Sequence, residues 1–403
     1  MKPNKIENKR VLVACLPDPS ENPRPFRAVW LLGIMGFDVW VMSPNFRFAI
    51  PNVSGHLPLN VSGREDYLWK VYRKIISIFR NLLTHMNFGH YIADEIHIWL
   101  LGAKSHLERI RNGEFDLIIV EDLELLSWLI EKKHTRTKVV FDAREYYPLE
   151  FEASLEFKLI NRFAQINRLA RALPKVDGFY TVCERLAQEY EAQFNQRPVV
   201  IRSTPFFATQ HSSKQVTCPI KMVHHGNANS DRGLEKMIDV VKRLDDRFTL
   251  DFYLVGNQNN INALKEYSKN CIRIRFKEPV DFNDLNKMLS LYDLGLYLLQ
   301  PTGFNTRFAL PNKFFEFIQA GLGVVVGPSP EMARLVNQYS CGAVSEGFHV
   351  DSMVALLENL SASEIENYKA AARLAAEELC WEVESKKLST LINDVLAHCE
   401  GFG

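Results

Sequence analysis

Asn312, Lys313 and Glu316 are spaced to share one face of a helix, and they offer an amide, an ammonium group and a carboxylate. Residues four apart are neighbours on a helix, so Asn312 and Glu316 lie one turn apart with Lys313 beside them. The other positions are apolar, which predicts burial on most sides, and a buried carboxylate needs a partner. This trio suits a polar ligand with hydroxyl and anionic groups. The alternative is a Lys313–Glu316 ion pair that seals the helix end.

The residues that flank this trio define the helix and its place in a sheet. Pro311 suits the first helical position because it has no N–H to lose, and Gly321 predicts the helix end. The run 323–326 is glycine followed by three valines, which predicts a fully buried parallel strand. Ligands of open α/β sheets bind beyond the carboxyl ends of the strands, so we expect the helix to border such an end.

A second polar segment, residues 224–234, joins a predicted strand to a predicted helix with the sequence His-His-Gly-Asn-Ala-Asn-Ser-Asp-Arg-Gly-Leu. Gly226 and Asn227 are small and let a ligand approach the backbone, and the first turn of the helix favours an anion. Arg232 adds a charge whose donors suit diphosphate oxygens. The apolar stripe of the following helix turns its N-terminus toward the same crevice as Glu316. The alternative is an ordinary loop with an exposed arginine.

Strand and helix patterns alternate along the chain, which is typical of doubly wound α/β sheets. A length of 403 residues suits two domains of about 200. A polar stretch with prolines at 203–219 has no apolar periodicity and predicts a linker. The predicted strands are 11–16, 38–42, 116–120, 138–142, 178–182 and 199–202 in the first half, and 220–225, 249–255, 272–276, 294–299, 323–327 and a short piece near 343 in the second.

Charged residues also follow predicted strands in the first half of the chain. Glu121 and Asp122 follow the strand at 116–120, and Arg144 follows the next one with Glu145 beside it. The carboxyl ends of parallel strands are where function gathers, so these residues are candidates for a site. The alternative is that each pair is structural, with Arg144 and Glu145 bound to each other.

Arg24 and Arg27 belong to the sequence Pro-Arg-Pro-Phe-Arg, which follows the first predicted strand. Its two prolines predict a stiff loop. The guanidinium groups suit phosphate oxygens, either of an acceptor or of a donor diphosphate. The alternative is that both arginines are simply solvated.

Composition excludes several classes of protein. The chain has 48 basic and 48 acidic side chains and a formal net charge of zero, so no global field favours nucleic acid or an anionic membrane. The polar N-terminus lacks the apolar core of a signal peptide, and no apolar run reaches the roughly 18 residues that span a bilayer. This predicts a cytoplasmic protein. The seven cysteines are scattered without a C-x-x-C pair, which argues against a zinc site or a disulfide framework.

The chain resembles the family 4 glycosyltransferases, which are retaining enzymes of the GT-B fold, over roughly residues 11–395. Residues 310–326 match the donor-site segment of the family in order and length. Residues 141–148 resemble its Asp-Ala-His-Glu block, with Arg144 in place of the histidine. The family also has a basic residue followed by glycine at the place of Arg232 and Gly233.

This resemblance implies two Rossmann-like domains and assigns roles to the candidate residues. Residues 1–203 would form the acceptor-side domain, 204–218 the linker, 219–378 the donor domain, and 379–403 a helix returning to the first domain. Glu316 would bind the ribose hydroxyls. The other expected roles are donor binding by Gly226, Asn227, Arg232, Asn312 and Lys313, catalysis by Arg232, Lys313, Arg144 and Glu145, and acceptor contacts by Arg24 and Arg27.

The implied reaction moves a sugar from a UDP- or GDP-sugar to a hydroxyl group of a glycan or lipid-linked acceptor, in bacterial surface polysaccharide or glycolipid synthesis. No permanently bound cofactor and no metal is expected, because GT-B enzymes generally use protein cations. Two departures stand against activity: Phe308 replaces the first of two family glutamates, and Asn227 replaces a second cation, which Lys313 would then supply. The alternatives are a GT-B epimerase of sugar nucleotides and a non-catalytic partner protein that binds nucleotide sugar.

Residues 67–83 are basic and aromatic with a helical period. Such a helix suits peripheral contact with the inner membrane, where a lipid-linked acceptor would lie. The alternative is a helix packed on the core with a solvated basic face.

Overall fold

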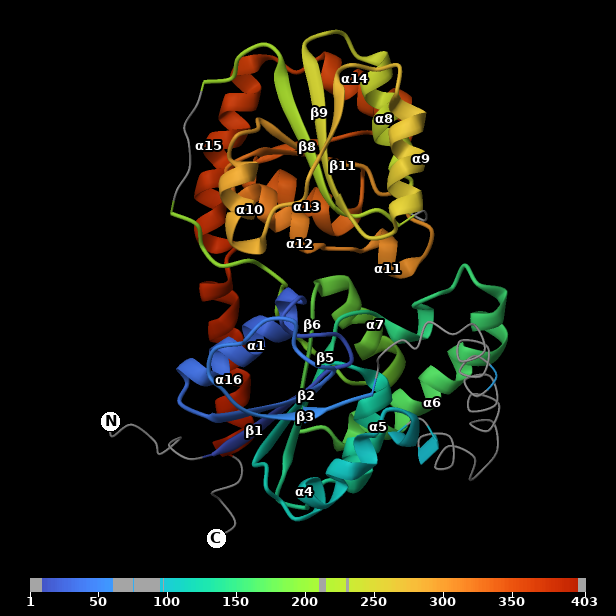
Figure 1. The fold of residues 1–403 in the computed structure, drawn as a ribbon, viewed down its shortest axis with the longest axis vertical. Helices are drawn as coiled ribbons and strands as arrows, with labels where there is room; N and C mark the ends of the chain where they lie inside the picture. The colour runs from blue at the N-terminus through green and yellow to red at the C-terminus, as the bar shows by residue number, and fades with distance from the viewer. Residues whose placement is uncertain are drawn as a thin grey trace. The chain divides into compact units, whose positions relative to one another are not determined.

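The computed structural model (Figure 1) divides the chain into two compact units, Met1–Arg202 with Ser385–Gly403 as unit 1 and Ser203–Glu384 as unit 2. Apart from Ile75, the predicted basic helix at 67–83 lies outside the described residues. No helix within the described ranges is long and apolar enough to cross a membrane. The structure describes residues 9–60, 75, 95–96, 98–209, 215–229 and 232–397.

Unit 1 contains a parallel sheet with the strand order β3-β2-β1-β4-β5-β6-β7. The connections from β1 and β4 leave toward opposite edges, so the point where the strand order reverses lies between these two strands. The strands are β1 (Arg10–Ala14), β2 (Asp38–Ser43), β3 (Val53–Pro58), β4 (Leu117–Val120), β5 (Lys138–Ala143), β6 (Gly178–Thr181) and β7 (Val199–Val200). The α-helices are α1 (Pro23–Ile34), α4 (Leu107–Arg111), α5 (Leu123–Lys132), α6 (Arg162–Ala172), α7 (Glu184–Phe194) and α16 (Trp381–Ala397), which begins in unit 2.

Unit 2 contains a second parallel sheet with the order β10-β9-β8-β11-β12-β13. Its reversal point lies between β8 and β11. The strands are β8 (Ile220–Asn227), β9 (Phe248–Val255), β10 (Ile274–Lys277), β11 (Leu294–Tyr297), β12 (Gly323–Val326) and β13 (Gly342–Val344). The helices are α8 (Glu235–Arg243), α9 (Gln258–Ser268), α10 (Phe282–Leu289), α11 (Phe304–Arg307), α12 (Asn312–Gln319), α13 (Pro330–Tyr339), α14 (Val350–Glu358) and α15 (Ala362–Glu378).

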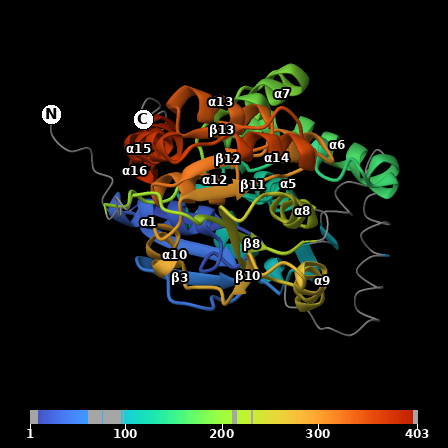
Figure 2. The same cartoon turned by 90° about the horizontal axis from the view of Figure 1, so that it is seen from above.

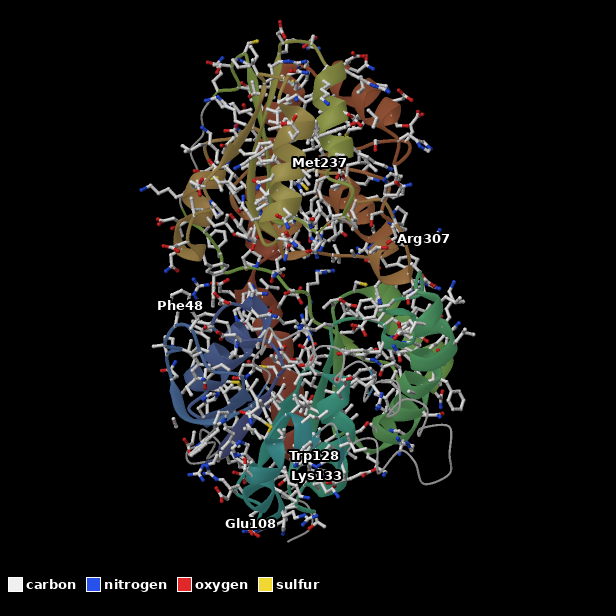
Figure 3. The ribbon with its side chains drawn as sticks, turned by 45° about the vertical axis from the view of Figure 1, so that its right-hand side comes forward. Phe48, Glu108, Trp128, Lys133, Met237 and Arg307 are labelled. Atoms are coloured by element: carbon white, nitrogen blue, oxygen red, sulfur yellow. The ribbon has the colours of Figure 1, made fainter. Side chains whose placement is uncertain are left out.

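Each unit buries its own core. Trp128 of α5 is buried in unit 1 and Met237 of α8 in unit 2 (Figure 3). In unit 2, α12 lies beside α15 (Figures 1 and 2), and it contacts β11 and β12. The apolar side chains of α12 are completely buried, so the helix has a fixed position against the sheet.

The alternation of predicted strands and helices is confirmed, since every segment predicted as a strand contains one. The prediction missed β3. This strand reads Val-Ser-Gly-His-Leu-Pro, lies at the edge of its sheet and has a register shift against β2. Glycine and proline reduce the strand signal, and an edge position tolerates both.

Two expected helix starts differ in the structure. The supposed loop with Arg24 and Arg27 is the N-terminal part of α1, because Pro23 begins the helix and Asn22 accepts a hydrogen bond from Arg24 N. Pro311 is the residue that precedes α12, not its first helical position.

The division between the units also differs from the expected one. Residues 204–218 belong to unit 2, and the return to unit 1 begins at Ser385, not at residue 379. Hydrogen bonds explain the shift. Trp381 N donates to Pro205 O at 2.7 Å, and Phe207 N donates to the Glu382 carboxylate at 2.9 Å, so these two stretches are held together in unit 2.

We predict that Gly295→Ala destabilises unit 2. A Cβ at this position of β11 would lie 2.3 Å from the ring of Phe317 on α12, so the helix must move. Overpacking of this kind costs about 1–3 kcal/mol, which thermal unfolding would show as a lower melting temperature. Gly347→Ala is the control, because its nearest neighbour is the movable Ser352 hydroxyl at 3.2 Å. Equal melting temperatures for the two variants would contradict the prediction.

Candidate functional site

The helix α12 brings Lys313 and Glu316 to the reversal point of the unit 2 sheet. Both side chains are buried, with 6% and 9% of their surfaces exposed, whereas Asn312 at the start of the helix is partly exposed. Pro311 is extended at φ −75° and ψ 153°, and Gly321 at φ 71° leads the chain away into β12. The sequence prediction of a buried helix with a polar edge therefore agrees with the structure.

Lys313 binds His224, a buried residue of β8. His224 Nδ1 lies 2.9 Å from the carbonyl oxygen of Leu296, which can only accept, so Nδ1 carries the proton. Nε2 is then the acceptor for Lys313 Nζ at 3.2 Å. Burial, followed by the charge of Lys313, holds the pKa of His224 well below its ordinary value, so the imidazole is neutral.

The ammonium group of Lys313 is destabilised by its surroundings. Burial, followed by the charge of Arg232, lowers its pKa to about 7, although the carboxylate of Glu316 acts in the opposite direction. Gly226, at φ 110°, makes room for this side chain, since a Cβ there would lie 3.0 Å from Nζ. The Lys313 side chain also lies over the ring of Tyr297, with Nζ 5.1 Å from its centroid.

Glu316 lies next to a second histidine. Its carboxylate oxygen is 3.3 Å from His225 Nε2, although the two groups are not aligned for a hydrogen bond. Burial lowers the pKa of His225 to about 3, and Lys313 contributes to the shift, so this histidine is also neutral. The ring that faces Glu316 is thus uncharged.

The ends of β8 and of the following loop complete the site. Asn227 pairs with Val255 in the sheet, is exposed, and lies against Gly256. Arg232 is partly exposed and close enough to depress the pKa of Lys313, while residues 230–231 lie outside the described residues. The arrangement gathers two cationic side chains and one carboxylate at the carboxyl ends of the strands. Chemically it can bind an anion next to a group that carries hydroxyls.

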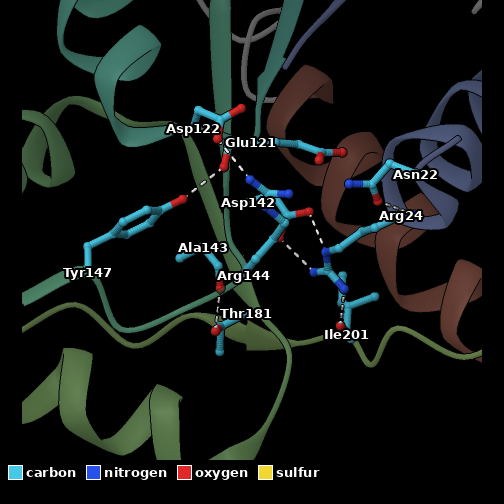
Figure 4. A network of polar contacts seen from close by, with 10 residues as sticks. All are labelled: Asn22, Arg24, Glu121, Asp122, Asp142, Ala143, Arg144, Tyr147, Thr181 and Ile201. Atoms are coloured by element: carbon cyan, nitrogen blue, oxygen red, sulfur yellow. Dashed lines mark hydrogen bonds and ion pairs between the residues drawn. The ribbon is translucent and has the colours of Figure 1, made fainter. Parts of the chain in front are cut away.

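Unit 1 has its own buried polar cluster at the corresponding edge of its sheet (Figure 4). Arg24 binds the Asp142 carboxylate through Nε and Nη2, both at 2.6 Å, and donates to Ile201 O at 3.1 Å. Its guanidinium also lies 5.2 Å from the ring centroid of Tyr180. Arg24 therefore holds β5 to the chain beyond β7, and neither Arg24 nor Arg27 is solvated, because both are buried.

Arg144 and Asp122 form the second ion pair of this cluster. Arg144 Nη2 donates to Asp122 at 2.8 Å, and the other oxygen of Asp122 accepts from Leu16 N at 2.7 Å. Arg144 is thus bonded across two strand ends, from the end of β5 to the end of β4. The Glu145 side chain is exposed, and that of Arg144 keeps 28% of its surface accessible.

Glu121 is a third carboxyl group in the cluster. Its side chain is completely buried, and neither carboxyl oxygen has a hydrogen-bond partner among the described residues. Burial and the charge of Asp142 raise its pKa to about 8, so the carboxyl is protonated at neutral pH. Its carbonyl oxygen accepts from Tyr147 OH at 2.9 Å.

Sequence reasoning gave no role to three of these participants. His224 and His225 follow a run of buried strand residues, and two polar rings continuing an apolar strand were the signal for a site. Asp142 is the last but one residue of β5 and has an apolar residue on each side, which marked it as a buried carboxylate in need of a cation.

No protein-family model matches the chain, and no curated protein matches it. Solved structures share its fold. Sucrose-phosphate synthase from Thermosynechococcus elongatus is 11% identical with a TM-score of 0.67, over 97% of this chain and 100% of that one. A glycosyltransferase from Rickettsia africae is 12% identical with a TM-score of 0.64, over 96% and 99%. HepE from Anabaena, solved with UDP and glucose, is 13% identical with a TM-score of 0.62, over 96% and 100%.

At these identities the likeness establishes the fold. The chain consists of two Rossmann-like parallel-sheet domains, as in the GT-B glycosyltransferases with which it aligns over nearly its whole length. The predicted fold class is confirmed. Residue roles are a separate matter, because one fold supports many activities.

We predict that Glu121→Gln changes how stability depends on pH. The ordinary pKa of the carboxyl is 4.5 and its folded pKa is about 8. Because the folded state favours the protonated form of Glu121, this group stabilises the fold fully below pH 4.5, and that stabilisation is lost as the pH rises toward 8. The glutamine amide of the variant does not titrate. The difference in melting temperature, variant minus parent, should therefore grow by at least about 3 °C between pH 5 and pH 8. Glu108→Gln, on the surface of α4, should show no growth, and a constant difference for Glu121→Gln would refute the assignment.

Proposed function

We propose that the protein is a retaining glycosyltransferase that uses a nucleotide-diphosphate sugar, UDP- or GDP-linked, as donor. The observation that carries this proposal is the convergence of Lys313 and Arg232 at the reversal point of the unit 2 sheet, with Glu316 one turn along the helix from Asn312. Two cations suit a diphosphate, and a carboxylate beside them suits the hydroxyls of a ribose. The shared fold with nucleotide-sugar enzymes supports the same reading.

In this proposal, Arg232 and Lys313 stabilise the diphosphate as its bond to the sugar breaks, because negative charge develops there in the transition state. His224 fixes the direction of the Lys313 ammonium group, and Gly226 and Asn227 let the donor approach the backbone. Asn312 and Glu316 hold the nucleoside. The acceptor hydroxyl forms the new bond on the same face of the sugar, and its proton passes to the departing phosphate. No metal takes part in this scheme.

Unit 1 would bind the acceptor in the same proposal. Arg144 is held in place by Asp122 and is partly exposed, so it is the best placed of the unit 1 candidates to contact a ligand, with Glu145 beside it. Arg24 and Arg27 are buried and would act by shaping that edge. We extend the proposal to a glycan or lipid-linked acceptor of a bacterial surface polysaccharide or glycolipid, handled in the cytoplasm near the inner membrane.

Two other functions give different results in the same assays. A sugar-nucleotide epimerase converts the donor without an acceptor, so product analysis of the donor alone identifies it. A non-catalytic nucleotide-sugar-binding partner, suggested by Phe308 and Asn227, binds donor and turns nothing over.

We predict that one of UDP, GDP, CDP, ADP and dTDP raises the melting temperature of the parent, because a ligand that binds only the folded state stabilises it. Glu316→Ala and Arg232→Ala should lose most of this shift while staying folded, and sugar transfer should be lost with it. Glu358→Ala, exposed at the end of α14, is the control and should respond like the parent. A parent that no nucleotide stabilises would overturn the proposed donor site.

We further predict that nucleotide affinity falls as pH rises from about 7.5 to 9. The pKa of Lys313 is about 7 without ligand, so the amine is mostly neutral in this range. A bound diphosphate favours the charged form, so binding takes up a proton and weakens as protons become scarce. The terminal phosphate, with a pKa of about 6, is already ionised in this window.

Lys313→Met separates this effect from other titrations. The variant should bind the nucleotide about tenfold more weakly at pH 7.5, since it lacks a charge-assisted hydrogen bond. Its affinity should be flat up to pH 9 in isothermal titration. A variant whose affinity still falls like that of the parent would show that another group titrates.

A further inference from the structure

Gln319, the last residue of α12, makes three hydrogen bonds from a buried position. Only 1% of its surface is exposed. Its amide nitrogen donates to Ala376 O at 2.8 Å and to Leu379 O at 3.0 Å, and its amide oxygen accepts from Ala208 N at 3.1 Å. The two donors and the acceptor of the side chain are therefore all used.

These partners lie close in sequence to the two places where the chain passes between the units. The first boundary falls at Ser203, a few residues before Ala208, and the second falls after Glu384, a few residues past Leu379. We call residues 203–209 and 376–384 the two crossings. They are also bound to each other, through Trp381 N to Pro205 O and through Phe207 N to the Glu382 carboxylate.

The bonds of Gln319 have a specific structural effect. The last carbonyl groups of a helix lack partners within the helix, and Gln319 supplies one to Ala376 near the end of α15. On the other side, Glu316 lies three residues before Gln319, less than one turn away on α12. A ligand that shifts or stiffens α12 therefore acts on both crossings through a single buried amide, and the crossings act back on α12 to the same extent.

We propose that Gln319 is a positioning residue that couples the ligand-binding helix α12 to both crossings. The part of this inference that concerns nucleotide rests on the proposed function. The link between α12 and the crossings does not.

The first test needs no ligand. Gln319→Met keeps the size and apolar stem of the side chain and removes its hydrogen bonds, and Gln338→Met on the exposed face of α13 is the matched control. Amide hydrogen exchange should become about tenfold faster at 203–209, at 376–384 and over α12 in Gln319→Met, because these bonds tie the segments together. The control should exchange like the parent. Unchanged exchange in Gln319→Met would overturn the proposal.

The second test adds the nucleotide that stabilises the parent. In the parent, exchange should slow over α12 and at both crossings. In Gln319→Met, the nucleotide should bind within about threefold of the parent affinity, since its contacts remain, and should slow exchange over α12 alone. If Gln319 had only a structural role, Gln319→Met would lower nucleotide affinity or protein stability. The nucleotide would then not slow exchange over α12 and at the crossings to different extents. Equal slowing at the crossings in both proteins would overturn the coupling.

Two further outcomes are decisive. If no nucleotide binds the parent, the proposed function fails, and the ligand-free comparison still decides whether Gln319 links the segments. If Gln319→Met does not fold, Gln319→Glu replaces it, because the carboxylate keeps an acceptor for Ala208 N and loses both donors. Faster exchange confined to 376–384 would then support the link, and uniformly faster exchange throughout unit 2 would refute it.

Discussion

The unit 2 site depends on a lysine ammonium group buried against a neutral histidine. Burial and Arg232 both act against the charge of Lys313, and the pKa of this group falls to about 7. The neighbouring parts of the structure make this burial possible. Leu296 sets the tautomer of His224, Gly226 leaves room for Nζ, and the apolar side chains of α12 fix the helix. A positive group held in this way would be stabilised by a nearby anion, which is the physical basis of the donor site that we propose.

Most of the architecture could be predicted from local patterns. Short β-branched runs separated by helical periods predict the parallel strands, because each strand of such a sheet is buried on both faces. The edge strand β3 has neither the pattern nor the burial, and could not be recognised. The start of α1 was mistaken for a loop because two prolines suggest a turn, although proline at the first positions of a helix is equally favourable.

The site was predictable where it is local and not where it depends on topology. The spacing of Lys313 and Glu316 on one helix is visible in the sequence, and their joint burial follows from the apolar residues around them. Their histidine neighbours come from β8, about ninety residues earlier, and only the sheet order brings them near. The same holds in unit 1, where Arg24 binds an aspartate 118 residues away. A buried ion pair of this kind cannot be assigned from spacing.

The departures from the resembled family have a consistent physical meaning in unit 2. Asn227 leaves the loop after β8 without the usual second cation, whereas the side chain of Lys313 occupies the space beside Gly226 in the same region. A loop cation would be solvated and charged at all times. Lys313 is buried, and burial together with Arg232 lowers its pKa to about 7, so its charge depends on its surroundings. A cation on α12, unlike one on a loop, is thus also joined through the helix to Gln319, which accepts a hydrogen bond from Ala208 N.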